Sequence, residues 1–246
     1  MRYLILGVTE ARGPDGGSLP LGGPRLRALL AALALRGGRT VPVTELVADV
    51  WGGGGEPPRD APAALQALVS RLRRALGGKH TVLAGATGYR LDATEDDIDL
   101  HVFRRLARQG AAELATDPAA AARTLGRALA LWRGPALADL PDADTEPAVR
   151  NAHALREAAV RDRIDAELRS GTEPAALLPE LEQLLVAHPY DEPLRARHLR
   201  ALRAAGRQAD ALLAYEEFRR ALADRLGTDP GPELRSLHAE LLAPAP

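Results

Sequence analysis

The sequence of 246 residues contains no cysteine, which excludes disulfides, zinc–thiolate sites and cysteine nucleophiles. Its longest uninterrupted apolar run is Ala28–Leu35, whereas a helix that spans a bilayer needs roughly 20 apolar residues. The first residues also lack the basic segment followed by an apolar stretch that marks a secretory signal peptide. We therefore expect a cytoplasmic protein that has no membrane partner.

Aromatic residues are scarce as well, at 3% of the chain, so the core must consist mainly of leucine, alanine and valine. Lysine occurs once, as Lys79, among 32 basic residues. The abundant arginine and alanine both have high helix propensity. This composition predicts a mainly α protein, and the length allows one large domain or two ordinary ones.

Charge is distributed unevenly along the chain. Residues 1–93 carry 12 basic and 7 acidic side chains, and residues 94–246 carry 20 basic and 26 acidic ones. A basic first part and an acidic second part indicate two domains, the first of which faces a polyanion. We predict that residues 1–93 and residues 94–246 are separate domains, with a linker at Ala93–Asp97.

Residues 1–93 mix strand and helix signals, in the order of a small sheet, three helices and a hairpin. The predicted elements are strands within Arg2–Glu10 and at Leu19–Leu21, helices from Pro24, at Glu45–Trp51 and at Pro62–Leu76, and a hairpin at Val82–Leu91. This order predicts a winged helix-turn-helix. In this architecture the second helix of the helix-turn-helix pair, here the last of the three predicted helices, lies in a DNA groove.

Residues 94–246 show helical spacing of apolar residues almost throughout, interrupted by glycine and proline. The spacing of Leu177, Leu181, Leu184 and Pro189 matches a helical-hairpin repeat, and it partly recurs 34 residues later, from Ala211. A period of 34 residues is typical of tetratricopeptide repeats. We therefore predict an all-α, tetratricopeptide-like second domain.

The helix at residues 61–76 has two chemically different sides when it is wound at about 100° per residue. One side is apolar, whereas the opposite side has Ala63 and Ala67 along its middle and glutamine and arginine at its edges. Such a surface suits a DNA groove, where glutamine pairs with adenine and arginine with guanine or phosphate. The predicted core residues are Leu65, Leu68, Val69, Leu72 and Leu76, and the predicted DNA contacts are Gln66, Ser70, Arg71, Arg73 and Arg74.

Two further parts of the first domain complete the predicted DNA interface. Arg25 lies at the start of its helix, where backbone N–H groups point outward and can hold a phosphate. The hairpin carries Thr87, Tyr89 and Arg90, which we expect to lie against the DNA backbone. Arg90 would reach a phosphate or the minor groove.

Two other interpretations stay open from the residues alone. An amphipathic helix with three arginines is most often a solvated surface helix. A helical-repeat module can also bind a protein partner without intrinsic DNA binding, through a groove lined by Trp132, Tyr190, Tyr215 and Phe218. Because these side chains lie at apolar positions of their helices, we expect them in the core instead, together with Trp51.

Catalytic and metal-binding patterns are weak. Gly52–Gly55 is not followed by the lysine and hydroxyl residue of a phosphate-binding loop, so we predict a flexible loop there. The best metal candidates are Asp97, Asp99 and His101, which would share a face in a strand but spread apart in the helix that we expect. We predict a protein that is not an enzyme and holds no metal or cofactor.

Several segments together resemble the SARP-type (AfsR/DnrI/RedD) transcriptional regulators. They occur in the family's order along nearly the whole chain, and no single short motif carries the resemblance. In the first part they are Leu21–Arg25, Val50–Gly52, Ala64–Gly77 and Gly88–Leu91. In the second part they are Ile98–Leu100 with Phe103, Ala130–Leu137, Gly206–Leu212 and Leu226–Leu234.

The resemblance implies a winged-helix DNA-binding domain followed by a bacterial transcriptional activation domain. It further implies an activator that binds direct repeats near promoters as a side-by-side dimer and recruits RNA polymerase holoenzyme. The chain resembles the small form of the family, without an ATPase domain. Two departures predict a weaker contact with DNA, because Ala63 stands where the family often has asparagine and Ala84–Ala86 stand where it often has a basic residue.

Overall fold

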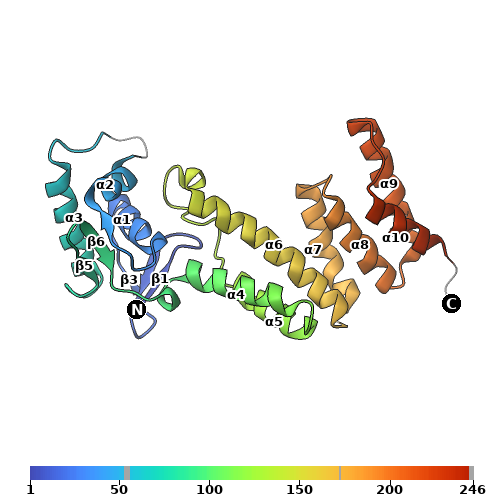
Figure 1. The fold of residues 1–246 in the computed structure, drawn as a ribbon, viewed down its shortest axis with the longest axis horizontal. Coiled ribbons are helices and arrows are strands. Elements are labelled where there is room, and N and C mark those ends of the chain that lie inside the picture. Colours follow the sequence, from blue (N-terminus) through green and yellow to red (C-terminus); the bar gives the residue numbers. More distant parts are fainter. Residues whose placement is uncertain (53–55, 172, 244–246) are drawn as a thin grey trace. The chain divides into compact units, whose positions relative to one another are not determined.

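The computed structural model describes residues 1–52, 56–171 and 173–243. Helices predominate among these residues, and the strands all lie before residue 92 (Figure 1). The mainly α fold that the composition predicts is therefore confirmed. Of the predicted loop at Gly52–Gly55, residues 53–55 lie outside the described residues.

The chain forms two compact units, which are residues 1–109 with 124–159 and residues 110–123 with 160–246. These units reflect packing, and the predicted division of function at residues 93 and 94 stays a prediction. No helix of the described residues combines the length and the apolar character that crossing a membrane requires.

Three helices of the first unit form the winged helix-turn-helix, as predicted. Local signals set their ends, since Pro24 occupies the first turn of α1, Gly37 follows it with a φ of +55°, and the Asp60 side chain caps α3. Their cores are leucine-rich, with Leu29, Leu30 and Leu33 of α1 fully buried. The bounds are α1 Pro24–Leu35, α2 Val43–Trp51 and α3 Ala61–Ala75.

The described residues also form two small antiparallel sheets, the second of which contacts α1, α2 and α3. The first has the order β1 (Arg2–Leu4), β2 (Glu10–Arg12), β3 (Ser18–Leu19), and the second has the order β4 (Val41–Pro42), β6 (Gly88–Leu91), β5 (Val82–Ala84). The hairpin β5–β6, hereafter the wing, is confirmed. The strand predicted within Arg2–Glu10 is present as β1 and ends at Leu4, because residues 5–9 leave the sheet between β1 and β2.

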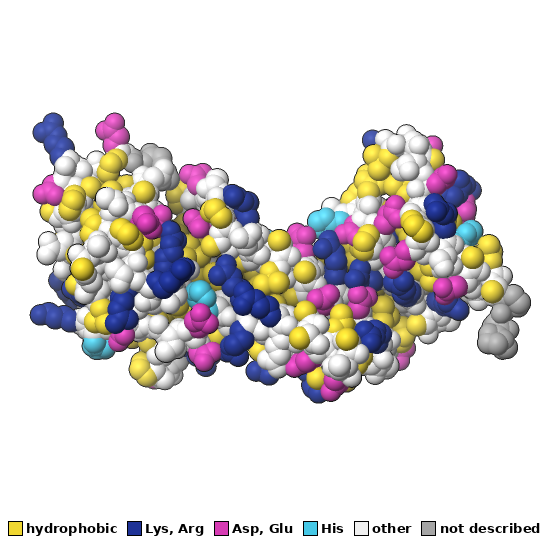
Figure 2. Space-filling view, in the orientation of Figure 1, with side chains coloured by type: hydrophobic (Ala, Val, Ile, Leu, Met, Phe, Trp, Pro, Cys, Tyr) yellow, Lys and Arg dark blue, Asp and Glu magenta, His cyan; other side chains and the backbone are white. Residues whose placement is uncertain are grey.

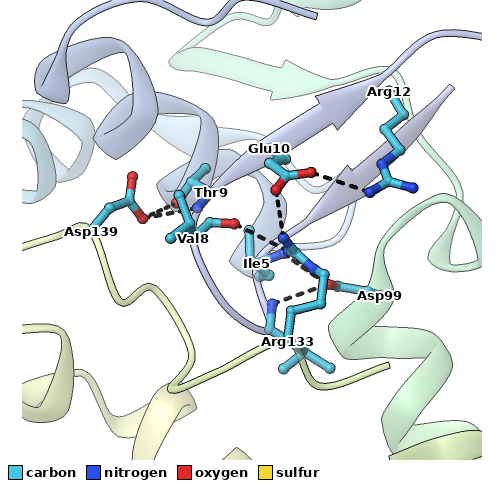
Figure 3. A network of polar contacts seen from close by, with 9 residues as sticks. Ile5, Val8, Thr9, Glu10, Arg12, Asp99, Arg133 and Asp139 are labelled. Atoms are coloured by element: carbon cyan, nitrogen blue, oxygen red, sulfur yellow. Dashed lines mark hydrogen bonds and ion pairs between the residues drawn. The ribbon is translucent and has the colours of Figure 1, made fainter. Parts of the chain in front are cut away.

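Residues 5–9 leave the sheet because the helical part of the same unit satisfies their backbone groups (Figure 3). The Asp99 carboxylate accepts hydrogen bonds from the Ile5 and Leu6 backbone N–H groups, at 2.8 and 3.0 Å. Three residues after α5 donate their own backbone N–H groups to the segment, Arg133 to Leu6, Leu137 to Ile5 and Ala138 to Gly7. Backbone polar groups that lose their sheet partners are thus paired again.

The Arg133 side chain closes this cluster, which we call the Asp99–Arg133 network. Its guanidinium donates to Glu10 Oε1 at 2.9 Å and to the Val8 carbonyl at 3.1 Å, and it lies 3.7 Å from Asp99 Oδ2. Asp99 is 5% exposed, and burial raises the pKa of its carboxyl although the Ile5 and Leu6 amides act in the opposite direction. Burying a carboxylate costs free energy, and the hydrogen bonds and the nearby guanidinium offset this cost.

The remaining elements of the described residues are helices, with two short 3₁₀ turns. Within the first unit, Phe103 and Trp132 pack edge to face with ring centroids 5.3 Å apart. The helix bounds are α4 Asp99–Glu113, α5 Pro118–Leu129, α6 Pro147–Arg169, α7 Pro174–Ala187, α8 Glu192–Ala204, α9 Gln208–Leu226 and α10 Pro232–Leu242. The 3₁₀ turns are η1 Glu95–Asp97 and η2 Ala143–Thr145.

The second unit stacks α7, α8, α9 and α10 as neighbouring helices, which confirms the predicted helical-hairpin architecture. Its core combines leucines of α7 and α8 with Tyr215 and Phe218 of α9. Trp51, Trp132, Tyr215 and Phe218 are all buried, as expected. The expectation for Tyr190 is wrong, because it lies in the turn between α7 and α8 and is 41% exposed.

Replacing Asp99 with alanine tests the Asp99–Arg133 network. The variant leaves the buried Ile5 and Leu6 N–H groups without their acceptor, and we expect the free energy of unfolding to fall by about 2–4 kcal/mol. Asp96→Ala is the matched control, because Asp96 is 75% exposed and pairs with Arg105 at the surface, where a pair contributes at most about 1 kcal/mol. Urea unfolding followed by circular dichroism measures both, and equal losses would contradict this role of Asp99.

Candidate nucleic-acid interface

Helix α3 turns its leucines inward, as its sequence spacing predicts. Leu65, Leu68, Val69, Leu72 and Leu76 are each at most 3% exposed. The helix begins where the Asp60 carboxylate accepts a hydrogen bond from the Ala63 N–H at 3.0 Å, and Arg73 and Arg74 lie in its last turn, where cations favour the helix dipole. The inward packing fixes which side of α3 is left for solvent.

The outer side of α3 carries most of the predicted contact residues. Gln66, Ser70, Arg71 and Arg74 are exposed, and so are Ala63 and Ala67 along the middle of the same side. The Ser70 hydroxyl donates to the Gln66 carbonyl at 3.0 Å, so its proton is already engaged within the helix. The structure therefore contains the predicted surface, which has small side chains along its middle and arginine and glutamine at its edges.

Arg73 differs from the other arginines of α3. It is half-buried, and its Nε donates to the Val82 carbonyl of β5 at 2.7 Å. This bond ties the C-terminal end of α3 to the wing. The structure thus gives Arg73 a positioning contact, while its predicted contact with DNA stays a prediction.

The wing is anchored to the rest of the fold through β4. Val41 of β4 pairs with Tyr89 of β6, and the Val43 N–H donates to the Thr87 carbonyl at 3.1 Å. Gly88 is required at this crossing, because a Cβ there would overlap the Val41 carbonyl oxygen. Strand β4 was not predicted, since two residues are too few to show an alternating pattern.

The predicted wing residues do not all point the same way. Thr87 is exposed at the turn, whereas Tyr89 and Arg90 are half-buried neighbours in β6 and therefore lie on opposite faces of the strand. Tyr89 shares its face with the fully buried Leu91. Arg90 lies 4.0 Å from Asp92 in a loose ion pair, and 43% of its side-chain surface is exposed, so the guanidinium stays accessible although the residue as a whole is half-buried.

Arg25 lies away from the leucine side of α1, exposed at the helix start. Its guanidinium stands 5.8 Å from the centre of the Trp51 ring. The first turn of α1 has no acidic side chain, and its N-cap, Gly23, offers no side-chain acceptor. These features suit an anion, as predicted, and the contact between Arg25 and phosphate stays a prediction.

The charge of this region is positive. Residues 56–92 contain six basic and three acidic side chains, and Figure 2 shows basic side chains projecting at the left of the view, over α3 and the wing. Ala63 and Ala84–Ala86, the two places where the sequence predicts a weaker contact with DNA, are exposed. They therefore leave two points of this surface without a hydrogen-bonding or charged side chain.

The candidate metal ligands have separate partners. Asp97 accepts hydrogen bonds from the Thr94 N–H and hydroxyl, which also lower the pKa of its carboxyl against the effect of burial. Asp99 faces Ile5 and Leu6, and His101 Nε2 lies 3.3 Å from the Ala34 carbonyl. Among the described residues no group of three metal-ligating side chains occurs.

The sequence patterns did not predict the residues that hold the segment between β1 and β2 in place. Asp99, Arg133 and Asp139 fix the segment between β1 and β2, and Asp139 Oδ1 accepts from both the Thr9 N–H and hydroxyl, at 2.8 and 3.0 Å. The one available signal was Asp99 itself, which we named from the sequence only as a candidate metal ligand. Its partners lie more than 90 residues earlier, beyond the reach of local patterns.

Known proteins match this chain in sequence over most of its length. The family model "Bacterial transcriptional activator domain" matches residues 98–242. The regulatory protein AfsR of Streptomyces griseus is 37% identical over 98% of this chain and 24% of its own length. The regulatory protein DnrI of Streptomyces peucetius is 35% identical over 89% of this chain and 84% of its own length.

A relative of known structure is similar over almost all of the chain. The solved structure of Mycobacterium tuberculosis EmbR in complex with a low affinity phosphopeptide superposes with a TM-score of 0.83, at 36% sequence identity. The superposition covers 98% of this chain and 64% of the EmbR chain. This chain spans about a quarter of the AfsR sequences and about three-fifths of the EmbR sequences that it matches.

Replacing Gly88 with alanine tests the anchoring of the wing. The added Cβ forces β4 away from β6, and we expect a loss of about 1–3 kcal/mol in the free energy of unfolding. Gly126→Ala on α5 is the control, because a Cβ there meets open space and a helical glycine-to-alanine change stabilises by about 0.5–1 kcal/mol. Thermal unfolding compares the two, and a Gly88→Ala protein as stable as the Gly126→Ala protein would refute the anchoring role.

Proposed function

We propose that this chain, which belongs to the SARP-type family of bacterial transcriptional regulators, binds double-stranded DNA with α3 in the major groove and the wing against the sugar–phosphate backbone. The observation that carries the proposal is the outer side of α3. This side is accessible and has small side chains along its middle, while the leucines of the helix are buried in the core.

The glutamine and the arginines of α3 have different expected roles. Gln66 would read an adenine edge, with a discrimination of about 1–3 kcal/mol for a good bidentate contact. Arg71 and Arg74 lie nearer the C-terminal end of α3, where they would hold phosphates or a guanine. Arg73 would act mainly by keeping the wing in register with α3, through its bond to Val82.

The wing and α1 would add backbone contacts around the groove. Thr87 in the turn of the wing and Arg90 of β6 would meet phosphates, whereas Tyr89 would contribute mostly to packing. Arg25 with the exposed N–H groups of α1 would hold a further phosphate. Because Ala84–Ala86 offer no charged or hydrogen-bonding side chain, the wing would contribute little to DNA affinity, and α3 would contribute most of it.

The second part of the chain would supply contacts with proteins. Residues 94–246 carry an excess of acidic side chains, and the activator family model matches 98–242. We therefore propose that it contributes to a side-by-side dimer on promoter direct repeats and contacts RNA polymerase holoenzyme. In this proposal the protein acts by binding, without catalysis, metal or cofactor, in the cytoplasm.

Arg71→Ala and Arg74→Ala test the groove-facing side of α3. Each removes one cation from the phosphate backbone, so affinity for duplex DNA should fall several-fold at about 100 mM salt, and the slope of log affinity against log salt should decrease by about 1. Fluorescence anisotropy with a labelled 30-base-pair duplex across a salt series, roughly 50 to 200 mM, measures both quantities.

Arg220→Ala on α9 is the matched control, since Arg220 is an exposed arginine of the other compact unit and should leave affinity and slope unchanged. Unchanged slopes in the two α3 variants would assign DNA binding to another surface. Failure of the unaltered protein to bind duplex DNA at any salt would favour a helical-repeat interaction module instead.

A further inference from the structure

The Ser70 hydroxyl has a defined direction on the outer side of α3, the helix at the left edge of the view in Figure 1. It donates to the Gln66 backbone carbonyl, about one turn earlier, with 3.0 Å between the two oxygens. Serine and threonine form this type of bond to the preceding turn within helices. Because a hydroxyl has one proton and two lone pairs, Ser70 presents only hydrogen-bond acceptors to a molecule outside the helix.

Ser70 is exposed, and its neighbours on the outer side of α3 leave room for a close approach. Ala67 and Ala63 lie about one and two turns before it on the same side, and both are exposed. A serine side chain is short, so it reaches the edge of a base only where the helix backbone comes close to the floor of the groove. The two alanines permit this approach, whereas Arg71 and Arg74 are long enough to reach phosphates at the sides.

The four bases differ in what they offer to an acceptor. In the major groove, adenine N6 and cytosine N4 are hydrogen-bond donors, whereas guanine O6 and N7 and thymine O4 are acceptors. A group that can only accept therefore pairs with adenine or cytosine. Turning the Ser70 hydroxyl to donate to guanine or thymine would break its bond to the Gln66 carbonyl, which corresponds to a loss of affinity of about three- to tenfold.

The Gln66 side chain does not have this restriction. Its amide carries both a donor and an acceptor, so it can pair with adenine in the bidentate manner. Four residues span about 6 Å along a helix, and successive bases of a strand are about 3.4 Å apart. Gln66 and Ser70 would therefore read base pairs at most about two steps apart.

We propose that Ser70 is a specificity-determining residue, which accepts a hydrogen bond from adenine N6 or cytosine N4 in the major groove, close to the base pair that Gln66 reads. This role rests on the proposed function, since it requires the outer side of α3 to lie in the groove. It adds the hydrogen-bond polarity of one base contact, which disfavours guanine and thymine at that position about three- to tenfold.

Selection of duplexes from a randomised library, followed by sequencing, tests this role on the full chain. The unaltered protein should select adenine or cytosine at one position where the Ser70→Ala protein shows no preference. Ser70→Thr keeps the hydroxyl and its bond within the helix, so it should keep the preference. Ser236→Ala, which removes an exposed serine of α10 in the other compact unit, is the control and should select the same sequences as the unaltered protein.

A base analogue then tests the atom that Ser70 contacts. At the position that depends on Ser70, purine replaces adenine, or 2-pyrimidinone replaces cytosine, and either change removes only the exocyclic amine. Fluorescence anisotropy at one salt concentration should show about three- to tenfold weaker binding by the unaltered and Ser70→Thr proteins. The Ser70→Ala protein should not distinguish the two duplexes, and it should fold normally because alanine has the higher helix propensity.

Three outcomes would each overturn this role of Ser70. They are identical selection by the unaltered and Ser70→Ala proteins, a preference for guanine or thymine at the position that depends on Ser70, and an equal effect of the analogue on both proteins. In all three the unaltered protein still binds duplex DNA, so the proposed function stands. Absence of duplex binding by the unaltered protein at any salt would instead contradict the proposed function, and this role of Ser70 with it.

Discussion

The Asp99 carboxylate, which accepts the backbone N–H groups of Ile5 and Leu6, is the interaction on which the first compact unit depends. The segment between β1 and β2 leaves its sheet and would otherwise bury unpaired polar groups, a cost that a small domain cannot carry. Arg133 adds bonds to the same segment. The β1–β3 sheet is thereby held by Asp99 of α4 and by residues after α5, within the compact unit that also contains the winged helix.

A second packing constraint, the shared contacts of α1, α2 and α3, determines which surface of α3 is exposed. Because the leucines of α1, α2 and α3 share one core, the outer side of α3 stays free for a partner. Its end is coupled to the wing through Arg73 and the Val82 carbonyl, and the wing is coupled to β4 at Gly88. Contacts of this kind restrict the movement of a surface, which would lower the entropic cost of the proposed docking in a DNA groove.

Local chemistry was enough to predict α3, because Asp60, Pro62 and the leucine spacing define its start and its buried side within the segment itself. It was not enough to predict β4, the role of Asp99 or the bond from Arg73 to Val82, since each depends on a partner distant in sequence or on a strand of two residues. The prediction that Tyr190 is buried was wrong for a related reason. Its apolar character suggested the core, but the turn between α7 and α8 leaves it exposed.

Because the chain has no cysteine, a single Ala67→Cys substitution can carry a photoactivatable crosslinker at the middle of the outer side of α3. If this side lies in the groove, irradiation in the presence of duplex DNA should yield covalent protein–DNA adducts. Leu213→Cys, at an exposed position of α9 with 63% of its surface accessible, should yield none. Adducts from position 213 and none from position 67, under conditions in which DNA is bound, would contradict the account.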